Sequence, residues 1–204
     1  MDQTACLPTR MNAAPDNPTE VIMTLDRELD HEVSLVLYGR AALYLGFPDA
    51  PAEFGTTQDV DGIIRLAQLP ALMEDHRFWD AQERTNRILE PRGLYITHLF
   101  CEDQVFLRPD WELHLVPVIR PVTRWLLLFR PHAVDLILTK MMRGNDPQDM
   151  EDIAFIVRKS GVTLAEMENA CDKARIPDIP ELRDACQQAL PIVREILHRN
   201  GQPG

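Results

Sequence analysis

Hydrophobic and polar positions repeat with different spacings along the chain, and each spacing predicts an element. In residues 18–32 apolar side chains recur at every third or fourth position, which is typical of a helix, with Thr19 as its N-cap. Residues 33–39 form an apolar run that ends in glycine and predicts a buried strand. The Ala- and Leu-rich residues 40–47 favour a short helix. We therefore expect the chain to begin as helix, strand and helix.

The middle of the chain changes from helical to strand-like spacing. A proline-rich loop at 48–57 precedes a second expected strand over 58–66. Residues 67–90 predict one long helix, whose expected apolar positions are Leu69, Leu72, Met73, Trp79 and Ile88. Residues 94–129 are strand-like, with charged or proline-containing turns between the strands. The expected strand segments are "LYITHLF", "QVFL", "WELHLVPVI" and "RWLLLF".

The last third of the chain has helical spacing. The expected helices cover residues 131–143, about 147–159, 163–174 and 180–199. This order of elements predicts an α/β (α+β) fold, in which one mixed β-sheet is flanked by helices and followed by a C-terminal helical part. We expect a flexible N-terminus at 1–17, a core at 18–130 and a helical region at 131–204 that packs on the core.

Charge and composition narrow the class of protein. The 204 residues carry a formal net charge of −11, which disfavours binding a large nucleic-acid surface but not a single RNA end. The four cysteines are scattered, as expected for free thiols in a reducing compartment, and His98, His114 and His132 lack metal-ligand spacing. No apolar run approaches the roughly 20 residues that span a bilayer, and the N-terminus lacks a signal-peptide pattern. We therefore expect a cytoplasmic protein without a membrane partner.

Two carboxylates stand two positions apart in the expected strand "QDVDGIIRL". Side chains at such a spacing point to the same face of a sheet, so Asp59 and Asp61 are expected to project together. Two like charges this close repel each other unless a cation lies between them. A divalent ion that prefers oxygen ligands, Mg²⁺ or Mn²⁺, suits this pair. Alternatively, the pair lies solvated at a strand end, where Asp61 and Gly62 begin a turn.

A strand–glycine–helix junction precedes the carboxylate pair by about twenty residues. Such a junction at Gly39 exposes backbone N–H groups at a helix N-terminus, which binds phosphate well, and Arg40 adds positive charge. Taken alone, a glycine at this place is usually only a turn residue. Taken with the carboxylates, it predicts a site in which the junction holds a triphosphate and the aspartates hold the metal ion that bridges it.

These two features resemble the core signature of a known superfamily. Gly39 followed by an Ala- and Leu-rich helix, and then the strand Thr57-x-Asp59-Val60-Asp61, are similar to the DNA polymerase β-like nucleotidyltransferases. Within this superfamily, the pattern of residues is most similar to that of the small bacterial nucleotidyltransferases, a group that includes the AbiEii-type toxins. Together with a second matching block, the resemblance covers roughly residues 33–66 and 131–157.

The second block adds basic and acidic residues on two neighbouring helices. A helix that carries Lys140 and Arg143 is followed by an Asp-x-x-Asp helix with Asp149 and Asp152, as in the same group. The resemblance implies that Lys140 contacts the triphosphate or the leaving pyrophosphate, and that Arg143 and Asp149 orient it or position the acceptor. The residues alone equally allow ion pairs that lock the two helices together.

The resemblance implies a minimal nucleotidyltransferase fold and a function. A nucleotidyl group would pass from a nucleoside triphosphate to an acceptor, which is a tRNA end, a protein hydroxyl or a small molecule. Asp59 and Asp61 would bind the catalytic metal ion, and Gly39, Arg40 and Thr57 would bind the nucleotide. A toxin-like role would add an antitoxin partner.

Three features depart from the superfamily pattern, and one of them is the spacing from Gly39 to Asp59, which the loop at 48–57 makes longer than in the shortest forms of the motif. Arg40 stands where Ser or Gly usually follows the glycine. The third carboxylate is not obvious: Glu112, expected in mid-strand with His114 on the same face, is the first choice, and Glu102 and Asp103 are its rivals. These departures favour an alternative, a nucleotidyltransferase-like module that has lost catalysis and binds a partner, for example in a toxin–antitoxin pair. A purely structural domain, in which the two aspartates belong to a turn, is the third reading.

Overall fold

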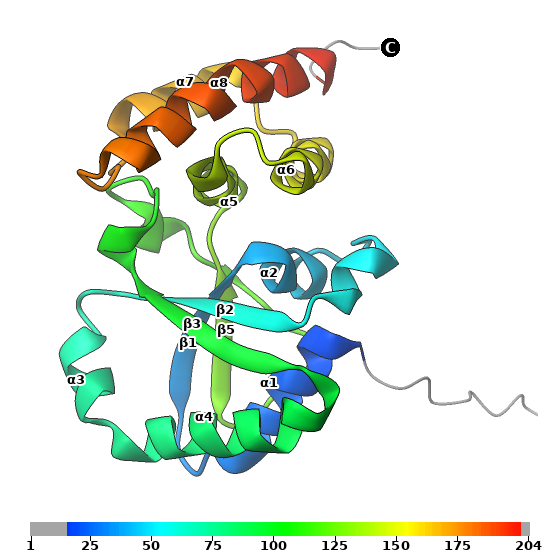
Figure 1. The fold of residues 1–204 in the computed structure, drawn as a ribbon, viewed down its shortest axis with the longest axis vertical. Coiled ribbons are helices and arrows are strands. Elements are labelled where there is room, and N and C mark those ends of the chain that lie inside the picture. Colours follow the sequence, from blue (N-terminus) through cyan, green and yellow to red (C-terminus); the bar gives the residue numbers. More distant parts are fainter. Residues whose placement is uncertain (1–15, 201–204) are drawn as a thin grey trace, which may run out of the picture.

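A single five-stranded sheet organises the structure, a computed structural model that describes residues 16–200 (Figure 1). The strands are β1 (Val33–Tyr38), β2 (Asp59–Ile64), β3 (Tyr95–Cys101), β4 (Val116–Pro117) and β5 (Leu126–Arg130). Their order in the sheet is β3-β2-β1-β5-β4. β1 pairs with β5 and β2 with β3 in parallel, whereas β1–β2 and β4–β5 are antiparallel. The predicted mixed sheet is thus confirmed. Most of the expected flexible N-terminus lies outside the described residues.

Helices flank the sheet, and those of the C-terminal part gather at one end of the molecule. They are α1 (Asn17–Glu28), α2 (Gly39–Gly46), α3 (Leu69–Glu74), α4 (His76–Leu89), α5 (Ala133–Lys140), α6 (Pro147–Ser160), α7 (Leu164–Lys173) and α8 (Pro180–Asn200). α5 to α8 lie together at the end opposite α4, and α2 lies between them and the sheet (Figure 1). Across residues 16–200, every helix is too short or too polar to cross a membrane.

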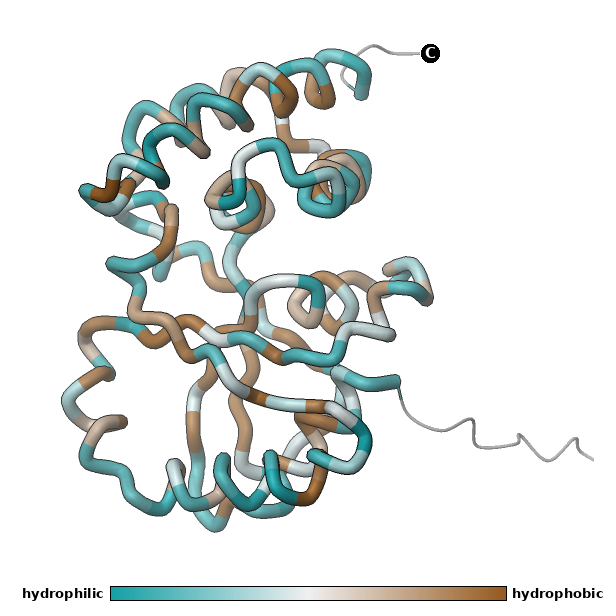
Figure 2. The backbone as a smooth tube through the Cα atoms, viewed as in Figure 1, coloured by the Kyte–Doolittle hydropathy of each residue, from teal (hydrophilic) through white to brown (hydrophobic). Residues whose placement is uncertain are grey.

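The apolar residues form two cores on opposite faces of the sheet. Alternate residues of β1, such as Leu35 and Leu37, belong to a large core that also includes α1, α4 and the C-terminal helices. Val36, between them, belongs to a small second core with Ile63 and Trp111. Figure 2 shows hydrophobic stretches along β1 and β5, whereas hydrophilic residues predominate on α4. Strand alternation therefore supplies both cores at once.

The single long helix expected over residues 67–90 is wrong. The structure has two helices, α3 and α4, because Asp75 interrupts the first and caps the second by accepting a hydrogen bond from the Phe78 N–H at 3.0 Å. The break shifts the buried face, so Met73 and Ile88 are 58% and 53% exposed. The residues of α4 that are buried are Phe78, Ala81, Thr85 and Leu89. The expectation that Thr19 caps the first helix is also wrong, because Asp16 is the N-cap of α1.

Of the expected strands between 94 and 129, the one over residues 104–107 is wrong, and the one over residues 111–119 is right only at β4. Residues 104–107 belong to no named strand, and only an isolated bridge joins Leu107 to Arg175. Their alternation arises because Val105 and Leu107 enter the small core while Phe106 enters the large one. The segment Trp111–His114 is a 3₁₀ helix that buries only its tryptophan. Burial that alternates between the two cores therefore gives residues 104–107 the apolar pattern of a strand.

A histidine connects the turn after α1 with the start of α4. The Nδ1 atom of His31 lies 2.9 Å from Asp30 Oδ1, and its Nε2 atom lies 2.7 Å from Asp75 Oδ2. Hydrogen bonds to Asp30 and then to Asp75 raise the pKa of His31 above its usual value of 6.5. His31 therefore links the turn after α1 to the α4 cap, and it does so most strongly in its protonated form.

We expect this contact to make stability depend on pH. Because the pKa of His31 is raised on folding, its contribution is complete below about pH 6.5 and is lost as pH rises through the raised value. The measurement is the free energy of unfolding of the natural protein and of His31→Asn between about pH 5 and 8. The difference between them should shrink as pH rises, whereas His198→Asn, at an exposed position of α8, should show no such trend. A constant difference for His31→Asn would contradict the prediction.

Candidate functional site

The junction between β1 and α2 has the geometry that the sequence predicted. Tyr38 ends β1 and precedes α2 without any side-chain cap, so the first N–H groups of the helix have no side-chain partner. Gly39 has φ +70°, in the left-handed region that favours glycine. A Cβ atom there would lie 3.3 Å from Asp61 Oδ2. The backbone of the junction therefore approaches the carboxylate closely.

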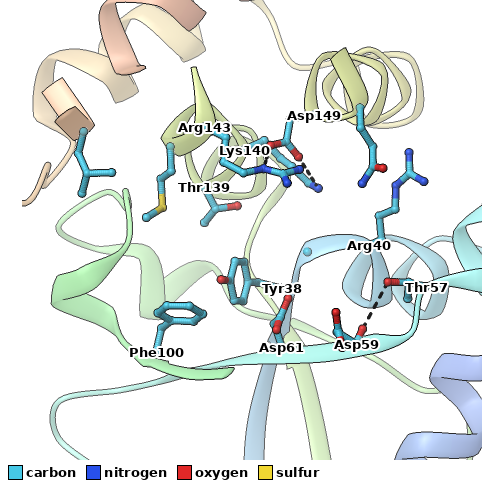
Figure 3. A pocket seen from close by; sticks show the side chains of 14 residues that line it. Tyr38, Arg40, Thr57, Asp59, Asp61, Phe100, Thr139, Lys140, Arg143 and Asp149 are labelled. Atoms are coloured by element: carbon cyan, nitrogen blue, oxygen red, sulfur yellow. Dashed lines mark hydrogen bonds and ion pairs between the residues drawn. The ribbon is translucent and has the colours of Figure 1, made fainter. Parts of the chain in front are cut away.

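The two aspartates of β2 line the same pocket (Figure 3), as their spacing predicted. Val60 between them points to the large core and is 1% exposed. Burial raises the pKa of Asp61, and the charge of Asp59 adds to this effect, whereas His98 and Lys140 oppose it. Thr57 lies beside them, and its hydroxyl donates a hydrogen bond of 3.5 Å to the Asp59 carbonyl oxygen. Asp61 is thus partly desolvated, and the exposed Asp59 beside it carries a like charge.

The pocket has a volume of about 470 Å³ and two walls. The sheet wall includes Gly39, Thr57, Asp59, Asp61 and Phe100. The helical wall includes Thr139, Lys140, Met142, Arg143, Gln148 and Asp149. Figure 3 shows the labelled basic residues of the helical wall above the two aspartates of β2, with the pocket between them. The fold therefore brings together residues that are some 80 positions apart in the sequence.

Ion pairs within the helical wall confirm the interpretation in which the two helices are locked together. Lys140 Nζ lies 2.9 Å from Asp149 Oδ1 and 2.6 Å from Asp152 Oδ2. Arg143 donates to the other oxygen of Asp149. Arg40, from α2, donates to Asp152 at 3.1 Å. The basic residues that were candidates for phosphate binding are therefore also structural partners of two buried aspartates.

Burial alone would raise the pKa of Asp149, but its neighbours reverse the direction. The hydrogen bond from Arg143 and the charge of Lys140 lower that pKa below its usual value. Asp149 is only 2% exposed, and these partners favour its charged form despite that burial.

The expectation that Glu112 lies in mid-strand is wrong. Glu112 belongs to the 3₁₀ helix Trp111–His114, outside the pocket, and its nearest basic partner is Arg65 at 3.9 Å. Its rival Glu102 is occupied elsewhere, because it accepts the Leu66 N–H and pairs with Arg175. Asp103, the other rival, does not line the pocket either. Among residues 16–200 no group of three or more His, Cys, Asp or Glu side chains forms a metal-binding cluster.

Sequence reasoning missed several residues that the sheet brings to the carboxylates. The Nδ1 atom of His98, on β3, lies 3.5 Å from Asp61 Oδ1, and its ring stacks on Phe100. All three of His98, Phe100 and Tyr38 lie in segments that were expected to be strands. The parallel pairing of β2 with β3 places His98 and Phe100, whereas the antiparallel pairing of β1 with β2 sets Tyr38 opposite Asp61. Neither register is encoded in any local pattern.

Comparison with protein-family models, curated proteins and solved structures finds no match to this chain. The resemblance to nucleotidyltransferases therefore stands on the motif residues, and the geometry described above is the basis for interpreting the site.

The first prediction for this site concerns its buried ion pairs. Lys140→Met leaves Asp149 and Asp152 without their shared ammonium, so the free energy of unfolding should fall by about 3–5 kcal/mol. The matched control is Lys159→Met, which removes a solvated pair with Asp49 and should cost less than about 1 kcal/mol. Urea unfolding measures both. Equal losses in the two variants would show that the buried pairs do not stabilise the fold.

Proposed function

We propose that the protein is a metal-dependent nucleotidyltransferase, which transfers a nucleotidyl group from a nucleoside triphosphate to an acceptor and releases pyrophosphate. The observation that carries this proposal is one pocket in which Asp59 and Asp61 lie beside the uncapped start of α2 and opposite a wall of basic residues. Chemistry of this kind depends mainly on positioning the phosphates and on stabilising charge. The pocket supplies groups for both.

The charge balance of the pocket supports a requirement for a metal ion. The basic side chains near the helical wall pair with aspartates: Arg40 with Asp152, Lys140 with Asp149 and Asp152, and Arg143 with Asp146 and Asp149. These three cations and three anions balance, so Asp59 and Asp61 leave the site negative. A triphosphate entering alone would be repelled. Binding would therefore need a cation at the aspartates.

The donor atoms at the aspartates fit Mg²⁺ or Mn²⁺. These ions prefer oxygen ligands and are commonly held by one or two carboxylates together with substrate phosphates and water. Asp59 and Asp61 supply the two carboxylates, and their mutual repulsion is relieved by a divalent ion between them. When bound, such an ion neutralises phosphate charge and stabilises the charge that develops during transfer.

Residues around the aspartates would hold the phosphates. The N–H groups at the start of α2, at Gly39 and Arg40, suit phosphate oxygens because they have no side-chain cap. The ammonium of Lys140 has three donors and gives two to Asp149 and Asp152, which leaves one for a ligand. The guanidinium of Arg40 is held by Asp152 and lies 5.0 Å from the centre of the Phe54 ring. These groups are fixed before any ligand arrives.

A second candidate function is binding without catalysis, as in a partner module of a toxin–antitoxin pair. Two observations favour it. Asp149, which lines the pocket beside Asp59 and Asp61, is already paired with Lys140 and Arg143, and Asp152 engages both Arg40 and Lys140. Only the enzyme transfers a nucleotidyl group, whereas the module has lost catalysis and binds a partner. Transfer of label is therefore the measurement that separates them.

The first test is stabilisation by ligand. At about 100 times its dissociation constant, Mg²⁺ with a nucleoside triphosphate should raise the melting temperature by about 5–10 °C, because the complex binds only the folded state. The shift should vanish without Mg²⁺ and in Asp59→Asn. Asp103→Asn, an exposed aspartate outside the pocket, should keep it. A shift that survives Asp59→Asn would place the phosphates elsewhere.

The second test follows the nucleotidyl group. We expect incubation with Mg²⁺, α-labelled nucleoside triphosphates and a total RNA and protein extract to label one class of acceptor. Asp59→Asn should reduce the rate by about a hundredfold or more, the scale seen when charge stabilisation is lost from an active site. Metal-dependent binding without any labelled product would instead support the binding module.

A further inference from the structure

One end of the pocket is apolar. Tyr38, Phe100, Met142 and Leu182 line it, although they come from four separate elements of the chain. In Figure 3, Phe100 and Tyr38 lie on the side of the pocket away from Arg40 and Thr57. All four side chains are only partly buried, so they keep apolar surface open to the pocket. The metal and phosphate functions proposed above use none of this surface.

The Phe100 ring is held firmly by two neighbours. Its plane is at 85° to that of Tyr38, with 5.7 Å between the ring centres, and it stacks on His98 at 5.5 Å. Met142 packs against the same small core as Phe100 and Tyr38. A fixed aromatic ring beside a flexible thioether forms a platform on which a flat ring stacks with little loss of side-chain entropy.

The hydroxyl of Tyr38 adds one polar group to this apolar end. Burial raises the pKa of Tyr38, so the hydroxyl stays protonated and is a hydrogen-bond donor at neutral pH. Among residues 16–200 it has no hydrogen-bond partner, and it is not fully enclosed by protein. An apolar surface with one available donor suits a flat ring whose edge carries acceptor atoms.

We propose that this apolar end binds the base of the nucleoside triphosphate, stacked against Phe100 and Met142, with the Tyr38 hydroxyl donating to the edge of the base. This inference rests on the proposed function, since it places the base in the same pocket as Asp59 and Asp61. The pocket of about 470 Å³ is continuous between the two ends, and this volume lies in the roughly 300–1,000 Å³ range of small-molecule sites. One ligand therefore reaches both.

The test compares two probes that differ only in the nucleoside. Mg²⁺–tripolyphosphate engages the polar end, whereas Mg²⁺–ATP engages both ends. ATP should bind about tenfold to a hundredfold more tightly, the scale of one stacked base. Phe100→Ala and Met142→Ala should remove most of this difference and leave tripolyphosphate binding unchanged. Met73→Ala, which changes an exposed methionine on α3, should keep the difference.

Two further variants separate recognition from folding. Phe100 also packs against the small core, so Phe100→Leu keeps apolar volume there while removing the flat face; it should weaken ATP binding with a near-natural melting temperature. Tyr38→Phe keeps the ring and removes only the hydroxyl. It should alter the relative affinities for ATP, GTP, CTP and UTP by several-fold, with tripolyphosphate binding unchanged.

Three results would overturn the base site, and they fall differently on the proposed function. Equal binding of ATP and tripolyphosphate, both lost in Asp59→Asn, would remove the base site and leave the proposed function standing. Unchanged ATP affinity in Phe100→Ala, with loss of transfer, would assign the apolar end to the acceptor instead. No metal-dependent binding of either probe would remove the proposed function and the base site together.

Discussion

The arrangement of the pocket depends on the fully buried carboxylate of Asp152. A charge without solvent must be neutralised locally, and here Lys140 of α5 and Arg40 of α2 both do so. Because α2 begins at the end of β1, the same carboxylate connects the sheet with the C-terminal helices. The two walls of the pocket thus keep a fixed separation, and Asp149 strengthens the connection through Lys140 and Arg143.

As a result, the two walls of the pocket differ in charge. Lys140 gives two of its three donors to protein carboxylates and Arg143 gives two of its five, so they offer a polyanion only their remaining donors. The sheet wall contributes surplus negative charge at Asp59 and Asp61. Under the proposed function, a site of this composition would discriminate against free phosphates and favour phosphates that arrive with a divalent ion. Structural stability and the proposed ligand selectivity would then follow from the same ion pairs.

What could be predicted from the sequence was mainly local. Because Asp59 and Asp61 are two residues apart in a strand, they lie on the same face. The ion pairs of Lys140 join residues that are only 9 and 12 positions apart. The segment 104–107 was misassigned because its apolar residues serve two cores, which local alternation cannot distinguish from two faces of a strand. His98 comes to Asp61 through the pairing of β2 with β3, and such a register depends on contacts between distant parts of the chain.

The close approach at Gly39 also limits how this chain can vary. Any side chain at position 39 would adopt a left-handed backbone at a cost and would press its Cβ atom against Asp61 Oδ2. A Cβ atom at position 39 and the carboxylate of residue 61 would therefore occupy neighbouring parts of the same small space. A larger residue at the first position is compatible with this backbone only when the second is shorter, and a shorter second residue gives up the carboxylate position. Substitutions at these two positions are thus coupled, although they lie 22 positions apart in the sequence.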